Sequence, residues 1–408
     1  MQKKKEYILY LGNYLNEFVV NERELPTNNP AGSNRMHRIA QALSVHYNPV
    51  IVSPGVSLNI KLNKSAIFKK TIITKDKGVL FYFPKTLAIP FLGLFYSYFT
   101  YFIATVRLLM KTKTVQVVVY NFDPLFVFLV LFIKIIKPRI KVINNVEDIS
   151  RPSLMDFKSS SEDRPMQQLI FYLCMKIIAH VSDGFIIPTK RFKDFLPYNK
   201  PFLVVTGCIK VNQEVVSKSS EKLVVFFSGK IAFEHGIDVF IEALKKIDNK
   251  MKYKNIEFRI SGGGPKSEWL ENQVKNFRNI NVTYYGFVSN EEYNNLLEKT
   301  DVCVALQKET GRHSNYKTPS KVYEYLGNSK IVIATDVGDL VALDTDIITI
   351  CKPLTSENLM KCLIEAYEML PELSIKRNKI GAYTYNHFDT SRVGNQVYNF
   401  ITTINHEK

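Results

Sequence analysis

The segment that decides the fold class is residues 223–247, which read LVVFFSGKIAFEHGIDVFIEALKKI. Its uncharged, β-branched and aromatic run 223–227 is typical of a buried strand. The run ends in the small-residue turn Ser228-Gly229. Beyond Gly236 the apolar residues recur at helical spacing, which predicts an amphipathic helix. A strand, a glycine turn and a helix in direct succession indicate an α/β fold with a parallel sheet.

The same alternation of strands and helices extends along the chain in both directions. Before this unit, strands are predicted at 7–11, 49–53, 78–83, 115–120, 140–144, 184–187 and 202–205. From the unit onward, they are predicted at 223–227, 256–260, 282–285, 302–306, 331–335 and 347–350. The polar segment 210–221 reads as a linker. The sequence therefore predicts two Rossmann-like domains, at 1–208 and 209–385, with a terminal helix in 386–408. We expect ligands at the carboxyl ends of the strands, in the interdomain cleft.

The charge of the 408-residue chain belongs to its first half. Residues 1–200 contain 28 Lys and Arg against 13 Asp and Glu, whereas residues 201–408 contain 26 against 25. The basic residues are dispersed among apolar stretches, and no nucleic-acid recognition module is recognisable. We therefore expect no nucleic acid as partner, and an anionic membrane surface or an anionic substrate instead.

The cysteines and the N-terminal segment indicate a cytoplasmic protein. The five cysteines are widely spaced and include no Cys-x-x-Cys, which argues against disulfides or a zinc site. The first apolar run, 7–11, is too short for a signal peptide.

One segment qualifies that expectation. Residues 86–106, TLAIPFLGLFYSYFTYFIATV, are uncharged and flanked by basic residues. Their length admits a transmembrane helix, but Pro90, Gly93 and several tyrosines suit a water–lipid interface better. A helix lying on the membrane surface, a buried core helix and a true span all remain open.

Three glycine turns follow strands in the second half. In the first, Gly229-Lys230 and His235-Gly236 combine a cation with a helix N-terminus, an arrangement that suits a phosphate. The second, residues 260–265 (ISGGGP), allows either close approach to a ligand or merely a tight turn. It is neither a P-loop nor Gly-x-Gly-x-x-Gly. The third, residues 285–288, is equally ambiguous.

Residues 318–327, TPSKVYEYLG, predict a short helix that Thr318 caps and Gly327 ends. Lys321 and Glu324 lie on one face of it. A carboxylate at this place can accept hydrogen bonds from paired hydroxyls such as those of a ribose. The alternative is a solvated Glu–Lys pair.

Read in order, these pieces resemble glycosyltransferase family 4. The ordered set consists of 229–230 with 235–236, 262–265, 286–288, 301–304, 319–325 and 336–338. Looser matches in the first half are 29–33, 121–124, 183–186 and 206–208. The resemblance implies the GT-B fold and a retaining enzyme that uses a nucleotide-activated sugar. It also implies that the terminal helix crosses back onto the first domain.

The resemblance assigns roles to individual residues. Lys230 corresponds to a cation on the donor diphosphate, Glu324 to the glutamate that binds the ribose, and Gly32 to the loop approaching the diphosphate from the first domain. The predicted donor-binding residues are Gly32, Gly229, Lys230, His235, Gly263, Gly286, Phe287, Val288, Pro319, Ser320, Lys321 and Glu324.

Three positions depart from the family pattern. His235 stands where a second phosphate cation, usually Lys, is expected, so its charge depends on pH. Tyr316 replaces the glutamate that contacts the sugar. Glu147-Asp148 replaces a His-Asp pair. The loop 309–315 is a candidate for the missing sugar contacts.

The expected reaction breaks the bond between a sugar and a diphosphate, and negative charge develops on the diphosphate. We therefore expect fixed cations and helix N-termini to stabilise this charge. The candidates are Lys230, Arg312 and the backbone amides at 317–320. Glu147 and Asp148 are candidates for orienting the acceptor hydroxyl. The Asp-x-Asp at 344–346 reads as structural, so we expect neither a metal nor another cofactor.

The sequence thus predicts a hexosyltransferase that moves a sugar from a UDP- or GDP-sugar to a glycan or lipid-linked acceptor. We expect it to be peripheral on the cytoplasmic face of the membrane, in bacterial surface polysaccharide synthesis. Two rivals stay open: another GT-B enzyme, such as a nucleotide-sugar epimerase, and a non-catalytic partner of a glycosylation complex.

Overall fold

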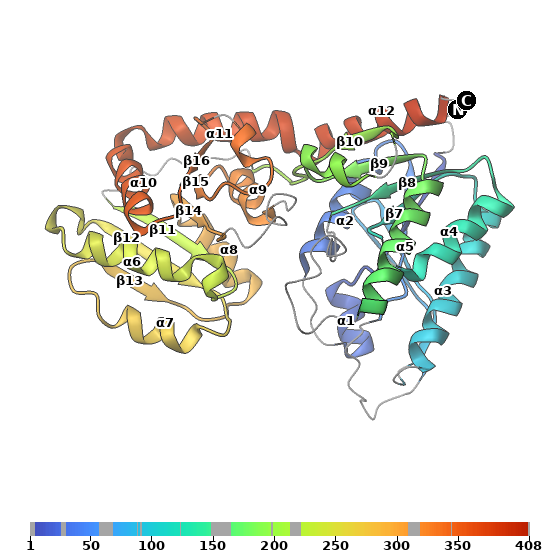
Figure 1. Ribbon diagram of the computed structural model, residues 1–408, viewed down its shortest axis with the longest axis horizontal. Helices are drawn as coiled ribbons and strands as arrows, with labels where there is room; N and C mark the ends of the chain where they lie inside the picture. Colours follow the sequence, from blue (N-terminus) through green and yellow to red (C-terminus); the bar gives the residue numbers. More distant parts are fainter. Residues whose placement is uncertain are drawn as a thin grey trace. The chain divides into compact units, whose positions relative to one another are not determined.

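The computed structural model describes residues 5–25, 30–56, 68–87, 89, 92–122, 124–147, 165–196, 199–212, 222–308, 319–343 and 345–406. The chain divides into two compact units. Unit 1 comprises Met1–Cys208 with Thr390–Lys408, and unit 2 comprises Ile209–Asp389. Each unit has a main sheet of mostly parallel strands covered by helices, which confirms the predicted α/β class (Figure 1).

Unit 1 contains an eight-stranded sheet in the order β10-β9-β8-β7-β1-β2-β5-β4. All neighbouring strands run parallel except the edge strand β4, which pairs antiparallel with β5. The strands are β1 Tyr7–Leu11, β2 Asn48–Val52, β4 Ile72–Asp76, β5 Val79–Phe83, β7 Thr114–Tyr120, β8 Lys141–Asn145, β9 Gly184–Ile187 and β10 Phe202–Val204. Two short strands, β3 Phe68–Lys69 and β6 Thr86–Leu87, form a separate antiparallel pair.

Side chains of the central strands alternate between two apolar layers, because successive residues of a strand point to opposite faces. On β1, Ile8 and Tyr10 join one cluster, whereas Leu9 and Leu11 join the other. Both faces are therefore buried, as in a doubly wound sheet.

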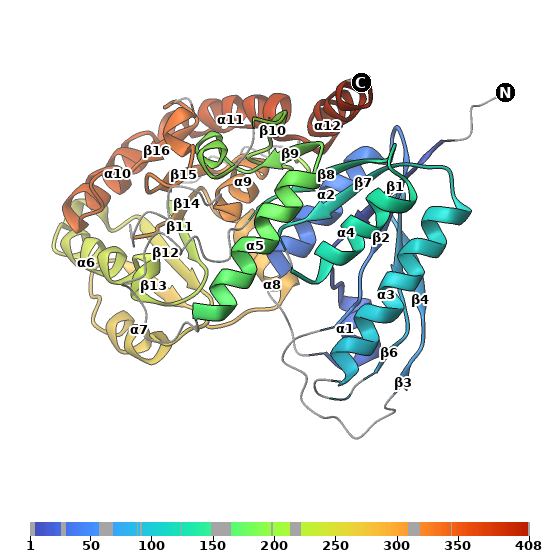
Figure 2. The same cartoon turned by 45° about the vertical axis from the view of Figure 1, so that its right-hand side comes forward.

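Helices cover both faces of the unit 1 sheet. They are α1 Glu17–Arg23, α2 Pro30–Leu43, α3 Leu92–Lys111, α4 Pro124–Ile136, α5 Pro165–Val181, the 3₁₀ turn η1 Lys190–Phe195 and α12 Thr390–His406. Helices α2 and α12 share the cluster of Ile8, whereas α3 and α4 share the cluster of Leu9. Figure 2 shows α3, α4 and α5 side by side.

The last helix, α12, starts later than the terminal segment expected at 386–408. Helix α11 runs to Phe388, and Asp389 is extended (φ −60°, ψ 141°), so α12 begins at Thr390. Gly394 of α12 lies so close to α2 that an added Cβ would stand 2.6 Å from the Ala42 carbonyl oxygen. This contact fixes α12 on unit 1.

Unit 2 contains six parallel strands in the order β13-β12-β11-β14-β15-β16. The strands are β11 Leu223–Ser228, β12 Ile256–Ser261, β13 Asn281–Tyr284, β14 Val302–Ala305, β15 Ile331–Ala334 and β16 Ile348–Ile350. The helices are α6 Ile237–Asp248, α7 Ser267–Val274, α8 Asn290–Glu298, α9 Ser320–Gly327, α10 Ser356–Glu368 and α11 Leu373–Phe388. Short 3₁₀ turns are η2 Phe233–His235, η3 Met251–Tyr253, η5 Leu340–Ala342 and η6 Leu370–Glu372. One continuous apolar core joins these elements.

Candidate functional site

The strand order of unit 2 places a site at the carboxyl ends of β11 and β14. Counted along the chain, the order is 3-2-1-4-5-6, so the connections leave in opposite directions from β11 and β14. Ligands of open α/β sheets bind in the crevice at such a switch point. Gly229 and Lys230 follow β11 directly, and α9 follows β14 along the chain.

Two of the glycine turns interlock beside this point. Gly229 has φ +152° and Gly262 has φ +127°, regions that side chains rarely enter. A Cβ on Gly262 would stand 1.8 Å from the Gly229 carbonyl oxygen, and one on Gly264 would stand 2.4 Å from that of Ile231. Gly262 and Gly264 therefore serve close packing of the two turns. Gly263 alone of the three has room for a Cβ, with Phe287 as its neighbour at 3.9 Å.

A polar cluster lies beneath these turns. Lys321 of α9 donates a hydrogen bond from Nζ to Ser228 Oγ at 2.9 Å, and Ser261 Oγ donates to Ser228 Oγ at 3.1 Å. Burial lowers the pKa of Lys321 to about 8, against an opposing effect of the Glu324 carboxylate. The cluster thus brings a cation from α9 to the end of β11.

Glu324 is half-buried on the same helix, three residues beyond Lys321. Burial, and next the nearby Glu324 charge, raise the pKa of Tyr293 on α8 well above its ordinary value. Tyr293 therefore stays a neutral phenol beside this carboxylate. The alternative left open, a Glu–Lys ion pair, is not found: no ion pair of the described residues joins Lys321 to Glu324.

Lys230 has a different environment from Lys321. Its side chain is 57% exposed, and Nζ lies 3.2 Å from Glu234 Oε1. The Lys230 side chain is therefore available to a ligand only in competition with Glu234 and water. His235 ends the turn η2, and Gly236 follows with φ 69° before α6 begins.

The predicted donor-binding residues Gly286, Phe287 and Val288 follow β13. Gly286 has φ +67°, and an added Cβ would meet nothing within 4 Å. Phe287 is 89% exposed, whereas Val288 packs against the core. An aromatic ring so exposed beside a glycine turn can stack on a planar ligand.

Helix α9 presents an N-terminus without a side-chain cap. Pro319 occupies the cap position, and Ser320 is the exposed first residue. Because the first amides of a helix lack intrahelical acceptors, this end can bind an anion. Pro319, Ser320, Lys321 and Glu324 thus lie on one element.

The unit 1 candidates gather at the carboxyl ends of β7 and β8. Glu147 forms an ion pair with Arg35 of α2 and accepts a hydrogen bond from the Tyr120 hydroxyl at 2.8 Å. An added Cβ on Gly32 would lie 2.6 Å from that hydroxyl. Burial, and next the Glu147 charge, raise the pKa of Tyr120. Gly32 lies in the first turn of α2 rather than in the predicted loop, and Glu147 connects this helix to the sheet.

Replacement of Glu147 by glutamine should destabilise unit 1. Arg35 and Glu147 side chains are only 15% and 12% exposed, so the variant leaves a largely buried guanidinium without its counter-charge. We expect a loss of about 2 kcal/mol, or about 6 °C in melting temperature. Calorimetry checks this result, with the exposed Glu22→Gln on α1 as the control. An unchanged melting temperature would show that the ion pair does not hold this end of the sheet.

Several predicted residues lie outside the described part of the chain: Asp148, the loop 309–315 with Arg312, Tyr316, Lys317, Thr318 and Asp344. Asp346 is described and pairs with Lys379. Within the described residues, no group of three His, Cys, Asp or Glu side chains could hold a metal ion.

Four residues of these clusters were not predicted from the sequence: Ser228, Tyr293, Arg35 and Tyr120. Tyr293, Arg35 and Tyr120 act through partners distant in the chain, so no local pattern marks them. Ser228 alone carries a signal, because it directly precedes Gly229 at a strand end.

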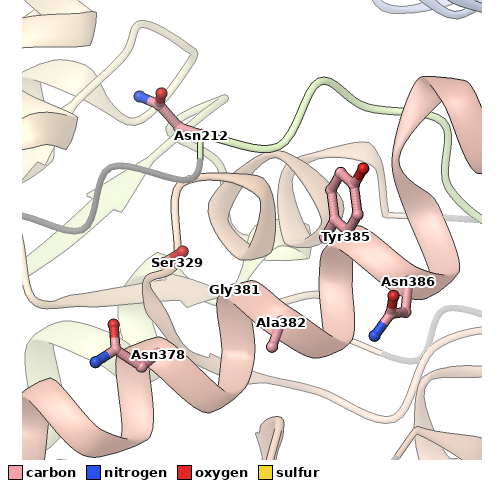
Figure 3. A pocket seen from close by; sticks show the side chains of 7 residues that line it. All are labelled: Asn212, Ser329, Asn378, Gly381, Ala382, Tyr385 and Asn386. Atoms are coloured by element: carbon pink, nitrogen blue, oxygen red, sulfur yellow. The ribbon is translucent and has the colours of Figure 1, made fainter.

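A separate cavity of about 290 Å³ lies along α11 (Figure 3). Its lining residues are Asn212, Ser329, Asn378, Gly381, Ala382, Tyr385 and Asn386. The lining contains no charged side chain and none of the predicted site residues. This cavity therefore does not suit a diphosphate.

Two largely parallel α/β sheets, the second with glycine turns, lysines and a helix N-terminus at its switch point, fit an enzyme of the GT-B type. Residues 209–387, nearly all of unit 2, match the family described as "Glycosyl transferases group 1". Unit 2 thus carries a domain of this family, which confirms the predicted enzyme class, a glycosyltransferase.

Solved structures share this fold over the whole chain. Sucrose-phosphate synthase from Thermosynechococcus elongatus is 10% identical, with a TM-score of 0.65 over 98% of this chain and 99% of its own. A glycosyltransferase from Rickettsia africae ESF-5 is 14% identical, with a TM-score of 0.64 over 100% of both chains. Anabaena Alr3699/HepE is 13% identical, with a TM-score of 0.61 over 97% of this chain and 99% of its own. These likenesses confirm the GT-B fold. No curated protein matches the chain significantly.

Proposed function

We propose that the chain is a retaining hexosyltransferase, related to glycosyltransferase family 4, that uses a UDP- or GDP-sugar. The observation that carries the proposal is the switch point of unit 2, where Lys321 of α9 reaches Ser228 and Gly229 at the end of β11. Structures of the similar Anabaena Alr3699/HepE are described as complexes with UDP, with UDP and glucose, and with UDP-glucose. The trehalose-6-phosphate structure from E. coli is described as bound with UDP-2-fluoro glucose.

The proposed mechanism follows from the charge that develops as the sugar leaves its diphosphate. Negative charge on the leaving group is stabilised by Lys230, by Arg312 and by the backbone amides near Pro319 and Ser320. The acceptor attacks from the face that the diphosphate leaves, so configuration is retained without a second carboxylate nucleophile. Glu147 and Asp148 orient the acceptor hydroxyl. The proposal requires no metal.

A thermal-shift panel tests the donor class. UDP, GDP and their sugars are added to the full chain, and the one that is bound raises the melting temperature. We expect a selective rise with one of the two bases. The absence of any shift would contradict a nucleotide-sugar enzyme. Product analysis with the donor alone separates a transferase from an epimerase.

Glu324→Ala should selectively reduce the rise in melting temperature that the bound nucleotide causes. Hydrogen bonds between ribose hydroxyls and a carboxylate contribute about 2 kcal/mol, so we expect affinity to fall about 30-fold. The matched control is Glu271→Ala on α7, whose side chain is exposed. If both variants bind nucleotide as the wild type does, Glu324 is not the ribose ligand.

The proposed acceptor is lipid-linked, and the supporting feature is an apolar surface on unit 1. One helix in the described residues, α3, is long and apolar enough to cross a membrane. Its buried face consists largely of small or hydroxyl residues, among them Gly93, Ser97 and Thr105. Four bulky apolar residues face outward: Leu92, Phe95, Phe99 and Met110 are 62–65% exposed. A soluble surface helix presents polar residues on this face instead.

Helices α4 and α5 extend the apolar surface. Phe128 and Ile135 of α4 are 78% and 75% exposed, and Leu169, Ile170, Leu173 and Ile177 form an exposed stripe on α5. We call these six residues, together with the four outward residues of α3, the apolar face. None of the three helices contains Asp or Glu, and Arg107, Lys111 and Lys176 are exposed on them. Apolar groups bordered by cations without acidic residues suit an anionic lipid surface.

We therefore place the enzyme peripherally on the cytoplasmic face of a bacterial membrane, where it would add a hexose to a lipid-linked acceptor during surface polysaccharide synthesis. A surface-lying α3 is favoured over a span, because Tyr101, Ala104 and Leu109 pack in the core of unit 1.

A further inference from the structure

The ammonium of Lys321 occupies an unusual position for a lysine of an α/β domain. Nζ lies 2.9 Å from Ser228 Oγ and 5.5 Å from the centre of the Tyr293 ring. It also lies 3.7 Å from the point where a Cβ on Gly229 would stand. The missing side chain of Gly229 thus leaves the ammonium open toward the end of β11.

The other lysines near the strand ends have different partners. Lys230 pairs with Glu234, and Lys308 pairs with Asp238 at 2.5 Å. Lys266 lies over the Phe233 ring at 4.5 Å. In the described residues, no carboxylate lies within ion-pair distance of Lys321, which instead contacts a hydroxyl and an aromatic ring. Among the described residues only Ser228 accepts a hydrogen bond from its three N–H groups, so the other two can reach a ligand.

The groups that face Lys321 come from three elements. Glu324 lies on α9 itself, Cys303 on β14 and Tyr293 on α8. Burial raises the pKa of both the Cys303 thiol and the Tyr293 phenol, so these groups are neutral at pH 7. A partly buried cation with so little compensation destabilises the ligand-free protein.

We propose that Lys321 is a direct ligand of the donor's diphosphate, with Nζ on a phosphate oxygen that lies over Gly229. This role rests on the proposed function and adds to it a second, enclosed cation beside the exposed Lys230. The anion supplies the missing counter-charge, and the glycine provides the space for it. The first-turn amides of α9 reach the same oxygen atoms.

A proton is coupled to this contact. In the ligand-free protein burial holds the pKa of Lys321 at about 8, so above that pH the amine is increasingly neutral. A diphosphate favours the ammonium and raises its pKa. Donor binding above pH 8 therefore takes up a proton, and affinity falls as pH rises.

The decisive variants are Lys321→Met and Lys330→Met. Lys330 is a matched control, because burial also lowers its pKa to about 8, but its Nζ bonds the carbonyls of Glu298 and Thr300. Binding of UDP-glucose and GDP-mannose to the full chain is measured by calorimetry at several pH values between 7 and about 9.5.

We expect Lys321→Met to bind the preferred donor about 30-fold more weakly at pH 7, because a charged hydrogen bond is lost. Its ligand-free melting temperature should be unchanged or higher. Lys330→Met should melt lower and bind the donor as the wild type does. The wild-type affinity should fall above pH 8, whereas that of Lys321→Met should not.

Three outcomes would contradict different parts of the proposal. If the wild type binds neither donor, the proposed function is wrong. If the wild type binds a donor and Lys321→Met binds it equally well, with the same dependence on pH, only the role of Lys321 is wrong. A ligand-free melting temperature that drops in Lys321→Met together with affinity would indicate a structural lysine.

Discussion

Gly262→Ala should disrupt unit 2 and abolish nucleotide binding. The new Cβ would stand 1.8 Å from the Gly229 carbonyl oxygen, so two backbone segments must separate. Gly262 also has φ +127°, where an L-residue is strained. The steric overlap with the backbone and the strained φ together lower the stability of the folded unit by about 4 kcal/mol, or roughly 12 °C in melting temperature.

The variant also affects nucleotide binding, because the turn of Gly262 is hydrogen-bonded to neighbouring parts of the site. The Gly262 amide donates to the Gly286 carbonyl at 2.7 Å, and Tyr284 donates to the Gly262 carbonyl at 2.7 Å. Displacement of this turn therefore moves both Gly229, beside Lys321, and the segment of Phe287. We therefore expect the folded variant to bind no nucleotide, so that UDP and GDP leave its melting temperature unchanged.

Gly286→Ala is the matched control. Gly286 also has a positive φ, +67°, but its Cβ would meet nothing within 4 Å. This variant should lose only about 1 kcal/mol of stability, because alanine is strained at a left-handed φ. Equal melting temperatures for the two variants would show that contact between the turns does not explain the requirement for glycine at 262.

The α/β organisation was predictable because local patterns determine it. Apolar runs of strand length, ended by glycine turns, are visible in a short window, and parallel strands bring such turns to one edge. The three glycine turns of unit 2 accordingly follow β11, β12 and β13. Which of the glycines serve packing became clear only from the distance between Gly229 and Gly262.

The missed elements lack such a pattern. Strand β4 is an edge strand that is mostly exposed, and it turns into β5 through Lys77 and Gly78 with φ 45° and 81°. These values define a type I′ hairpin, but Lys77 stands where Asn or Asp would signal it. Similarly, α3 begins at Leu92 rather than at residue 86, and its polar buried face does not follow from composition.

The contacts within the site could not be predicted, because they join distant residues. Lys321 and Ser228 are 93 positions apart, and Tyr120 and Glu147 are 27 apart. The sequence placed Lys321 and Glu324 on one helical face and suggested a pair. The structure instead directs the lysine toward β11, which makes it available to a phosphate.

Replacing Phe95 and Phe99 together by glutamate should release the enzyme from anionic vesicles. Both side chains are exposed, at 65% and 63%, one turn apart on α3. Burial of a phenylalanine in an apolar medium contributes about 2 kcal/mol, so loss of two weakens binding by about 1000-fold. Co-sedimentation with vesicles of phosphatidylethanolamine and phosphatidylglycerol in equal parts measures this change.

The control has to carry the same change in charge without touching the apolar face. Phe18→Glu with Val45→Glu meets that need, because these residues are 50% and 63% exposed on unit 1 and neither belongs to α3, α4 or α5. We expect the control to bind vesicles at most a few-fold more weakly, through the general electrostatic term that salt screens. Equal losses of vesicle binding in the two double variants would show that net charge alone determines the interaction.

If the wild type dimerises without lipid and Phe95→Glu/Phe99→Glu is monomeric, the apolar face binds a second copy of the chain instead. Retained turnover on a soluble acceptor, with loss of turnover on a lipid-linked one, would show that the apolar face serves the acceptor rather than the donor.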